Sequence, residues 1–385
     1  MGIEYSPGVV TTDLAFYYDM GNRQKSFAGP PTTNLTPNMS LQAVQGAPTV
    51  SFVGVEDGWN KYSLSGTWTS GTYPYSMAVQ AVTFTGGVTY STGAFIKTTV
   101  PQKFASLFSG MNYVNEPMNN VGTSFSITQP DGSIYVGRSG FQYTNTTAQV
   151  GYLLSQPIIG QSFNGATDFV FVRQGQIEIG SFPTPFVAGT RTNTQAILDL
   201  TGNNTITASS LTYASDGTFS FNGGNFITIP NTQLGNGNVQ WTVNAWVRTT
   251  TTTNDLGNGS VMSNSSGGPV YSMMGVNSGR IVYWTYQNNA WSQKLSTGKI
   301  VNDNAWHMLT WVNYANNTMD MYVDGVQDFF VANSTSGNNN PVDRIGGSWS
   351  AQFVGSIAAV SRYTRALTAE EVNNNFSALR GRFGV

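Results

Sequence analysis

Apolar and polar residues alternate along most of the chain, in short runs separated by turn residues. Residues 168–172, 241–247 and 306–312 place an apolar side chain at every second position, which is the period of a strand with one buried face. The tripeptide Pro-Asp-Gly at 130–132 joins two such runs and predicts a hairpin. Because runs of this kind, with turn residues between them, are typical of antiparallel β-sandwiches, the pattern predicts an all-β protein.

A helical pattern occurs only near the end of the chain, at residues 368–376. Thr368 stands where a helix needs an N-cap residue, and Glu371 follows at the third position, as in a capping box. We expect one short C-terminal helix at the surface, packed on the β core.

The alternating runs form two arrays. The first extends from about residue 36 to residue 189 and ends in a stretch that holds two prolines and several small residues. The second extends from about residue 191 to Phe376. A length of 385 residues allows two to three domains, and the lack of a repeat of fixed period disfavours a solenoid or a propeller.

The second array resembles a known sandwich family. Its segments FSFNGGNFITIP (219–230), WTVNAWVRT (241–249), DNAWHMLTWVNYANNTMDMYVDGVQ (303–327) and GSIAAVSRYTRALTAEEVNNNF (355–376) are similar, in this order, to concanavalin A-like lectin/glucanase domains of the laminin-G kind. The resemblance implies that the third segment forms a hairpin and that the fourth leads from the last strand into the short helix. It implies little about the ligand.

Residues 14–35 resemble the opening strand and loop of the same family, in which this segment runs on into DLTGNN. Here DLTGNN lies at 199–204, more than 160 residues later. The resemblance therefore implies two antiparallel β-sandwich (jelly-roll) domains, one inserted in a loop of the other. We expect a discontinuous laminin-G-like domain, 1–34 with 190–385, and an inserted domain at 35–189.

The inserted array resembles a carbohydrate-binding-module jelly roll found in phage tail and appendage proteins. The similarity lies in NLTPNMSLQ (34–42), where the domain begins, and in GQIEIGSFPTPFVAGTR (175–191), where it ends. The family pattern often carries Glu where this chain has Gln42, which weakens the case for a structural calcium there.

Composition excludes several functional classes. Only 9% of the residues are charged, 17 basic against 19 acidic, whereas ~25% is average. Without clustered Lys and Arg, a nucleic-acid binder is excluded. The chain has no cysteine and one histidine, which excludes disulfides, thiolate metal sites, cysteine nucleophiles and multi-histidine metal sites. Aromatic residues reach 13%, a composition common among extracellular and virion-surface proteins.

The N-terminal segment and the apolar runs bear on where the protein is expected. The N-terminal segment lacks the basic and apolar regions of a secretory signal peptide, and no apolar run approaches the ~18 residues of a membrane span. An extracellular style of composition without an export signal is expected of a virus particle that is assembled in the cytoplasm and released by lysis. We therefore expect the protein on the outer surface of a virion, without membrane insertion.

Enzymatic chemistry is not expected. Glycoside hydrolysis needs two carboxylates across the sugar, and the glucanase relatives carry them as E-x-D-x-x-E on one strand, a string that does not occur here. His307 shares a strand face with Leu309 and Trp311, and we expect a partly buried strand histidine. No strand carries two members of the glutamate set, which is Glu4, Glu56, Glu116, Glu178, Glu370 and Glu371.

A calcium ion is the one cofactor that the sequence leaves open. Calcium needs hard oxygen ligands, and relatives of the laminin-G kind bind it through loop carboxylates and carbonyls. Asp324-Gly325 is first of all a turn signal, so no ligand set is assigned and the expected cofactor is none. The loop carboxylates considered are Asp255, Asp303, Asp324 and Asp328.

Sugar binding would need exposed aromatic rings that stack on pyranose faces, with amides beside them. Each such residue has an alternative role in the core or in a subunit interface, because large aromatic side chains dominate both. Trp284 is a further aromatic with Asn and Gln nearby. The candidate residues are Trp59, Trp68, Tyr73, Tyr75, Trp291 and Trp349.

These observations predict a non-enzymatic bacteriophage virion surface protein, a capsid decoration, head fibre or tail appendage, that adheres to host surface glycans. The expected partners are other virion proteins, further copies of the chain and a host cell-surface polysaccharide, with many weak contacts adding up by multivalency. Two alternatives remain. One is a purely structural decoration protein that stabilises a capsid, and the other is a glycan-degrading enzyme.

Overall fold

Two compact units make up the chain. The computed structural model describes residues 8–22, 26–36, 41–43, 49–68, 77–107, 118–152, 155–158, 160–209, 211–213, 218–233, 239–252, 259–264, 271–287, 290–334, 341–347 and 352–385. Unit 1 comprises residues 1–30 and 192–385, and unit 2 comprises residues 31–191. The predicted domains, 1–34 with 190–385 and 35–189, have their junctions within a few residues of these limits.

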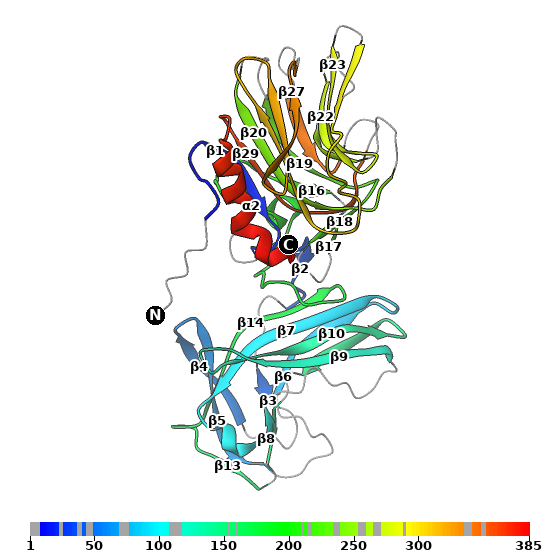
Figure 1. Cartoon of the computed structure of the whole chain (residues 1–385). Coiled ribbons are helices and arrows are strands. Elements are labelled where there is room, and N and C mark those ends of the chain that lie inside the picture. Colours follow the sequence, from blue (N-terminus) through cyan, green and yellow to red (C-terminus); the bar gives the residue numbers. More distant parts are fainter. Residues whose placement is uncertain are drawn as a thin grey trace. The chain divides into compact units, whose positions relative to one another are not determined.

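Antiparallel strands dominate both units (Figure 1). Within the described ranges the helices are α1 (Asn193–Ala196), α2 (Ala369–Phe383) and a single 3₁₀ turn, η1 (Pro101–Lys103). The predicted all-β class with a short C-terminal helix is confirmed. Neither α-helix has the length and hydropathy that a membrane-spanning helix needs, among the residues described.

Unit 1 is a sandwich of two sheets. The first has the strand order β17 (Thr212–Tyr213), β18 (Phe219–Asn222), β29 (Val354–Tyr363), β20 (Trp241–Arg248), β25 (His307–Asn313), β26 (Met319–Val323) and β27 (Val326–Val331). The second has the order β16 (Thr207–Ser209), β19 (Phe226–Gln233), β28 (Pro341–Ile345), β21 (Ser260–Ser263), β22 (Tyr271–Asn277), β23 (Arg280–Gln287) and β24 (Ala290–Leu295). Trp311 of the first sheet is fully buried and donates its indole N–H to the carbonyl of Val282 in the second, at 3.0 Å.

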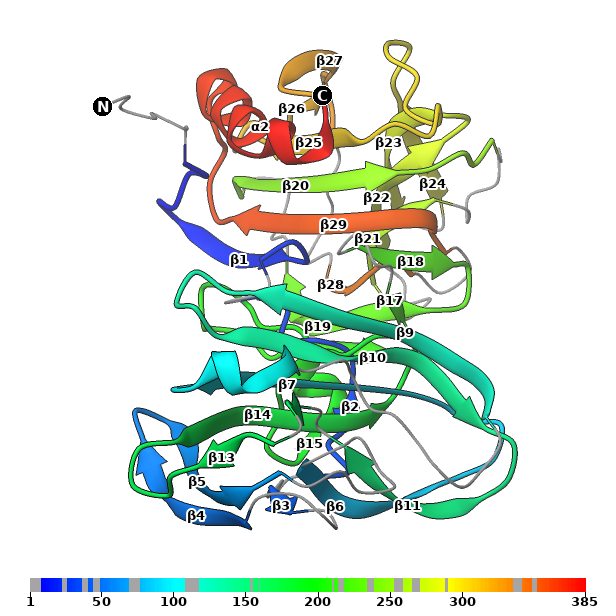
Figure 2. The ribbon, with the colours of Figure 1, turned by 90° about the horizontal axis from the view of Figure 1, so that it is seen from below.

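The N-terminal segment belongs to the first sheet of unit 1. Strand β1 (Leu14–Asp19) pairs antiparallel with β29, on the side of β29 opposite β20 (Figure 2). The carboxylate of Asp199 accepts a hydrogen bond from the backbone N–H of Tyr17 at 2.9 Å, and Leu200 N–H donates to Tyr17 O at 2.7 Å. Residues 14–19 and 199–204 are therefore neighbours in space, although unit 2 lies between them in the sequence.

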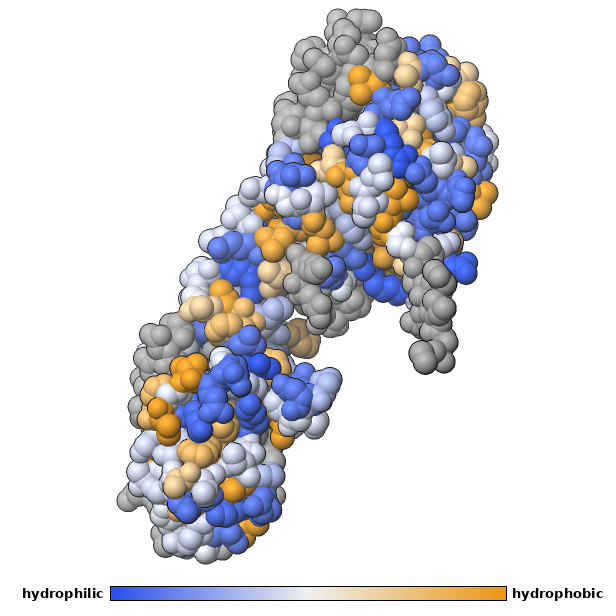
Figure 3. All heavy atoms as spheres, turned by 90° about the vertical axis from the view of Figure 1, so that its left-hand side faces the viewer, coloured by the Kyte–Doolittle hydropathy of each residue, from blue (hydrophilic) through white to orange (hydrophobic). Residues whose placement is uncertain are grey.

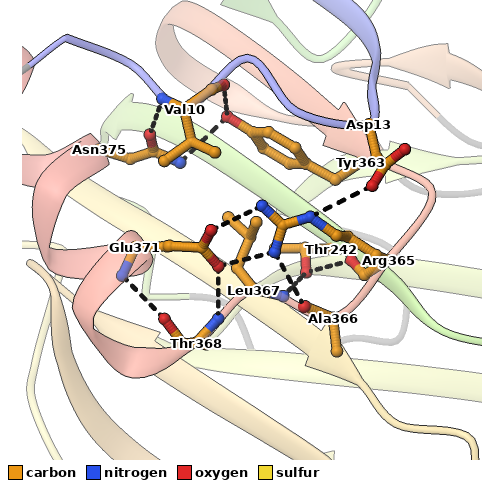
Figure 4. Close-up of polar contacts among 10 residues, drawn as sticks. All are labelled: Val10, Asp13, Thr242, Tyr363, Arg365, Ala366, Leu367, Thr368, Glu371 and Asn375. Atoms are coloured by element: carbon orange, nitrogen blue, oxygen red, sulfur yellow. Dashed lines mark hydrogen bonds and ion pairs between the residues drawn. The ribbon is translucent and has the colours of Figure 1, made fainter.

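Helix α2 covers the outer face of this sheet. The predicted capping box is present, because Glu371 N–H donates to Thr368 Oγ1 and the Glu371 carboxylate accepts from Thr368 N–H (Figure 4). The pattern predicted an end at residue 376, but the helix continues to Phe383. Its last turn is stabilised by packing, since the Phe383 ring stacks on Trp246 at 4.2 Å, a contact between distant segments that local periodicity does not show.

Unit 2 is built around one large sheet. Its order is β13 (Ser162–Phe163), β5 (Trp59–Thr67), β14 (Phe169–Ile179), β7 (Thr89–Thr98), β10 (Ile134–Tyr143) and β9 (Met118–Thr128), with β4 (Thr49–Glu56) beside β5. The smaller ladders are β11 (Thr147–Tyr152), β6 (Met77–Phe84) and β3 (Gln42–Ala43); β12 (Ser155–Pro157) and β8 (Phe104–Leu107); and β2 (Thr32–Thr33) and β15 (Thr190–Arg191). The hairpin predicted at 130–132 is confirmed between β9 and β10.

The two ends of unit 2 lie side by side. Thr33 pairs with Thr190 and Thr32 with Arg191 across the β2–β15 ladder. The Asn34 amide then donates to the carbonyls of Gly175 and Val187, both at 3.1 Å. A domain whose ends are this close fits into a loop of another domain without separating the strands of its host.

Candidate functional site

The structure shows where several of the predicted sugar-stacking residues lie. Trp59 and Trp68 are 3% and 2% exposed, so neither presents a free ring face. Trp68 follows β5, and its backbone pairs with that of Gly160 and Gln161, which holds the residue inside unit 2. Trp284 is also fully buried. Tyr73, Tyr75 and Trp349 lie outside the described residues.

Trp291 is the predicted residue that the structure leaves accessible. It stands on β24 of unit 1, is 43% exposed, and faces Tyr286 across the β23–β24 hairpin. The two ring centroids are 4.9 Å apart, and the exposed amide side chain of Gln293 follows two positions later on the same strand face. The pair forms a small aromatic surface with a hydrogen-bonding group beside it, and the role of Trp291 in sugar binding stays a prediction.

A larger aromatic surface lies on unit 2. In the large sheet, side chains such as Tyr62, Ile96 and Val172 point to the hydrophobic core, so their neighbours along each strand point to the opposite face. That opposite face carries aromatic rings and cations from five adjacent strands. We call it the aromatic–cation face, and its members are Trp59, Lys61, Phe95, Lys97, Phe125, Tyr135, Phe169, Phe171 and Arg173.

Strand register places rings and cations alternately across this face. Phe171 on β14 lies directly between Lys61 on β5 and Lys97 on β7. The Lys61 ammonium is 4.1 Å from the centroid of the Phe169 ring, and the Lys97 ammonium is 4.9 Å from that of Phe171. At these distances each cation is attracted by the ring quadrupole.

Trp59 is buried by this arrangement and belongs to none of the hydrophobic core clusters of the described residues. The Lys97 ammonium lies 4.6 Å from its ring centroid, and the Arg173 guanidinium carbon lies 4.2 Å from it. Arg173 is also 5.2 Å from the centroid of Phe95, which is its direct partner in the next strand. Trp59, which the sequence analysis predicted as a sugar-binding residue, thus belongs to the candidate face. Its ring, however, is covered by the side chains of Lys97 and Arg173.

The rings next to Arg173 pack against one another on the sheet, with angles of 33° and 39° between successive ring planes. Phe95, Tyr135 and Phe125 follow one another with centroid distances of 4.6 and 5.3 Å, and all three are half-buried. A Cβ atom added at Gly93 would overlap the Tyr135 hydroxyl, and one at Gly137 would overlap the Phe125 ring. The absence of side chains at these two glycines therefore gives the rings room to lean over the strands and present their faces.

The charges of the face are incompletely balanced. Lys61 pairs with Glu56 at 2.8 Å, and hydrogen bonding and charge from Lys61 lower the pKa of that carboxyl group. Arg173 has a longer contact of 3.5 Å with Asp131. For Lys97, the described residues contain no carboxylate within ion-pair distance. Within ion-pair distance, the three cations of the face thus have two carboxylates, and the buried Glu178 acts on Tyr135 from a longer range.

Two further atoms complete the electrostatics of the face. The Arg173 Nε–H is buried and has no hydrogen-bond acceptor among the described residues. Burial, and then the charge of Glu178, raise the pKa of Tyr135 to about 12, so its hydroxyl stays neutral and adds no negative charge at physiological pH. The face therefore combines stacking surface with unsatisfied positive hydrogen-bond donors.

The described glutamates of unit 2 and of α2 have structural partners or positions in different parts of the chain. Glu178 is fully buried and accepts hydrogen bonds from the Gln176 amide at 2.7 Å and the Thr184 hydroxyl at 2.8 Å. Glu370 and Glu371 stand in the first turn of α2. Glu4 and Glu116 lie outside the described residues, as does Asp255.

Sequence reasoning missed the aromatic–cation face as a whole, although the Phe-Val-Phe-Val run of β14 shows that both faces of this strand are apolar.

His307 is held between two carboxylates in unit 1. Its Nδ1 is 2.8 Å from Asp324 Oδ2, and its Nε2 is 3.1 Å from Asp303 Oδ1. Burial by itself lowers the pKa of His307, but the hydrogen bonds and charges of Asp324 and Asp303 outweigh it and the pKa is raised. Both ring nitrogens face carboxylate oxygens, so the protonated imidazole donates one hydrogen bond to Asp324 and one to Asp303.

The loop carboxylates considered for calcium are occupied by donors. Lys299 Nζ lies 2.6 Å from Asp324 Oδ2, and the Lys299 backbone N–H donates to Asp328 Oδ1 at 2.7 Å. Asp328 also accepts from the Ser296 hydroxyl. Within the described ranges, no three carboxylate or histidine side chains are grouped as a metal ion would need. A calcium site remains a prediction without a ligand set.

Comparisons with known proteins support the predicted resemblance for unit 1. Residues 221–373 match the family model described as the concanavalin A-like lectin/glucanases superfamily, which confirms the resemblance over that stretch of the chain. A comparison with curated proteins found no match.

Solved structures show weaker similarity. Domain 4 of AbnA, an extracellular arabinanase from Geobacillus stearothermophilus solved with arabinotriose, is 22% identical, with 46% of this chain aligned to 91% of that one and a TM-score of 0.38. The binding domain of Paraclostridial Mosquitocidal Protein 1 is 18% identical over 47% of this chain and 49% of its own, with a TM-score of 0.37. That of Botulinum neurotoxin DC is 14% identical over 49% and 50%, with a TM-score of 0.39. This chain thus spans about half the length of the two toxin binding domains, and similarity at this level carries no argument about function.

Proposed function

We propose that this protein is a non-catalytic glycan-binding protein that works on the outer surface of a virus particle. The observation that carries the proposal is the aromatic–cation face of unit 2, where Phe95, Tyr135 and Phe125 form a continuous half-buried ring surface. Partly exposed rings beside hydrogen-bonding groups are suited to stack on the apolar face of a pyranose, while the neighbouring donors bind hydroxyl groups. Trp291 and Tyr286 supply a second, smaller surface of the same kind on unit 1.

Affinity would come from multivalency. A shallow face with few polar groups binds one sugar segment weakly, because only a few contacts offset the entropy lost on association. Many copies on a symmetric particle convert weak contacts into strong attachment. The proposed partners are therefore further copies of this chain, other virion proteins and a host cell-surface polysaccharide.

A structural decoration protein is the second candidate, because two sheet edges of unit 2 expose apolar residues. Val53 and Val55 on β4 are 55% and 67% exposed, and Val121 and Ile127 on β9 are 60% and 53% exposed. Open strand edges with apolar side chains pair readily with other chains. On the face of the molecule drawn in Figure 3, apolar residues occur in small groups among hydrophilic ones. Assembly through an edge and glycan binding through a face are compatible roles.

A binding experiment on the full chain tests the proposal. The protein is displayed multivalently and screened against host surface polysaccharides, alongside Phe95→Ala, Tyr135→Ala and the control Phe330→Ala, which removes a ring exposed on β27 of unit 1. Each ring of the face should contribute about two- to tenfold in affinity per site, as expected for aromatic contacts of about 0.5–1.5 kcal/mol. Equal binding by all variants, or no binding to any polysaccharide, would contradict the proposal.

A further inference from the structure

We infer that the aromatic–cation face selects an acidic polysaccharide, with an anionic group of the sugar bound by Lys97 and Arg173 while the sugar ring stacks on Phe95 and Tyr135. This inference rests on the proposed glycan-binding function and adds the chemical class of the ligand. The observation that supports the inference is the position of the charged groups of Lys97 and Arg173 beside the aromatic rings of the face.

The first step is the unbalanced charge. Lys61 pairs with Glu56 at 2.8 Å, whereas no described carboxylate lies within ion-pair distance of Lys97, whose charge acts on Glu56 only from a longer range. Arg173 keeps one weak contact to Asp131 at 3.5 Å, and its buried Nε–H has no acceptor. A buried donor without an acceptor costs free energy that an incoming anion would recover. Neutral hydroxyl groups recover less, because they add no attraction between opposite charges.

The second step is geometry. Phe95 lies two residues before Lys97 on β7, about 7 Å along the strand, and directly opposite Arg173 on β14. Tyr135 on β10 is the cross-strand partner of Phe95. The anion-binding groups of Lys97 and Arg173 therefore lie close together on one side of the ring surface, next to Phe95. The side chains of Lys97 and Arg173 already pack against the Trp59 ring, so little further side-chain conformational entropy is lost when a ligand binds them.

The third step concerns other polyanions. The chain as a whole is acidic, with 19 acidic against 17 basic residues. A nucleic acid needs many phosphates neutralised, and the described part of this face offers only the charges of Lys61, Lys97 and Arg173 against Glu56 and Asp131. A sugar chain with spaced acidic groups fits one local excess of positive charge beside a stacking surface.

The test uses the full-length chain and polymers of defined charge. Polygalacturonate supplies carboxylates, its carboxyl-reduced form is the neutral control, and a sulfated galactan supplies a different anion on a similar backbone. Binding is measured by isothermal titration calorimetry at low and at high salt. We expect polygalacturonate or the sulfated galactan to bind at least about tenfold more tightly than the reduced polymer, with salt weakening the binding. Preference between the two acidic polymers identifies the anion.

Matched variants assign the effect to the face. Lys97→Met removes the charge and keeps an aliphatic stem over Trp59, and we expect it to lose at least about tenfold in affinity for the acidic polymer while affinity for the neutral one is unchanged. Lys97→Arg should restore binding. The control Arg380→Met removes one positive charge from the exposed C-terminal end of α2 in unit 1 and should change nothing. Thermal unfolding of each variant checks that the fold is kept.

The outcomes separate the two proposals. If the reduced polymer binds as tightly as polygalacturonate, or if Lys97→Met binds like wild type, the inference is wrong while the glycan-binding function stands. If single-stranded DNA or an acidic peptide competes as well as polygalacturonate, the face is a general anion site and the inference is also wrong. If no polymer binds to wild type or to the ring variants described above, both the inference and the proposed glycan-binding function are wrong.

Discussion

The ion pair between Arg365 and Glu371 should make the stability of unit 1 depend on acid pH. The Glu371 carboxylate accepts two hydrogen bonds from the Arg365 guanidinium, at 2.7 and 2.6 Å, and a third from Thr368 N–H at 2.9 Å (Figure 4). The hydrogen bond from Arg365 is the largest cause that lowers the pKa of Glu371 from 4.5 to about 2. A lowered pKa in the folded state means that protonation opposes folding.

The magnitude follows from the difference in pKa. A change from 4.5 to about 2 corresponds to at most about 3.4 kcal/mol of unfolding free energy. The Glu371 side chain is 26% exposed, so solvent screening reduces our expectation to about 1–2 kcal/mol. This stability is present above pH 4.5 and is lost as the pH falls from 4.5 through about 2.

The assay compares wild type with Glu371→Gln in urea between pH 7 and pH 2, with tryptophan fluorescence as the probe. Units that unfold separately give separate transitions, and the one that shifts identifies unit 1. We expect the variant to be about 1–2 kcal/mol less stable at pH 7 and the difference to shrink toward zero at pH 2. The matched control is Glu370→Gln, which removes the neighbouring carboxylate from the same helix turn and should lose about 0.5 kcal/mol. A difference that stays constant down to pH 2, or one as small as the control's, would refute the reasoning.

Three further predictions follow from the structure. The pKa of His307 is raised above 6.5 in the folded protein, so the stability that its protonated form contributes is complete below pH 6.5 and is lost as the pH rises through the raised pKa. The difference in urea midpoint between wild type and His307→Gln should therefore narrow from pH 6 to pH 9. Phe383→Ala should destabilise unit 1 by about 2 kcal/mol in the same assay, because its half-buried ring stacks on Trp246, and a loss near zero would mean that the last turn of α2 is not docked. Gly93→Val should displace the ring of Tyr135, which tyrosine fluorescence quenching by acrylamide would detect as greater access, and should weaken glycan binding; an unchanged Tyr135 would contradict the packing described.

Local patterns were sufficient for many elements. The turn at 130–132 and the capping box of Thr368 and Glu371 depend on residues a few positions apart, and both occur as predicted. The end of α2 was placed too early, because Phe383 is held by Trp246 from a strand more than 130 residues away. A periodic pattern detects a strand but does not show which distant strand or helix covers its second face.

The aromatic–cation face likewise has one feature that the sequence predicts and another that depends on the tertiary structure. Alternation in β14 already places Phe169, Phe171 and Arg173 on one side of a strand and valines on the other, so the amino-acid sequence by itself determined that both sides would be packed. Whether Trp59 would be open or covered depended on Lys97 and Arg173, which come from two other strands. Only the tertiary structure decided this, because register across a sheet joins residues that are distant in the chain, and cation–ring distances follow from register and not from spacing in the sequence.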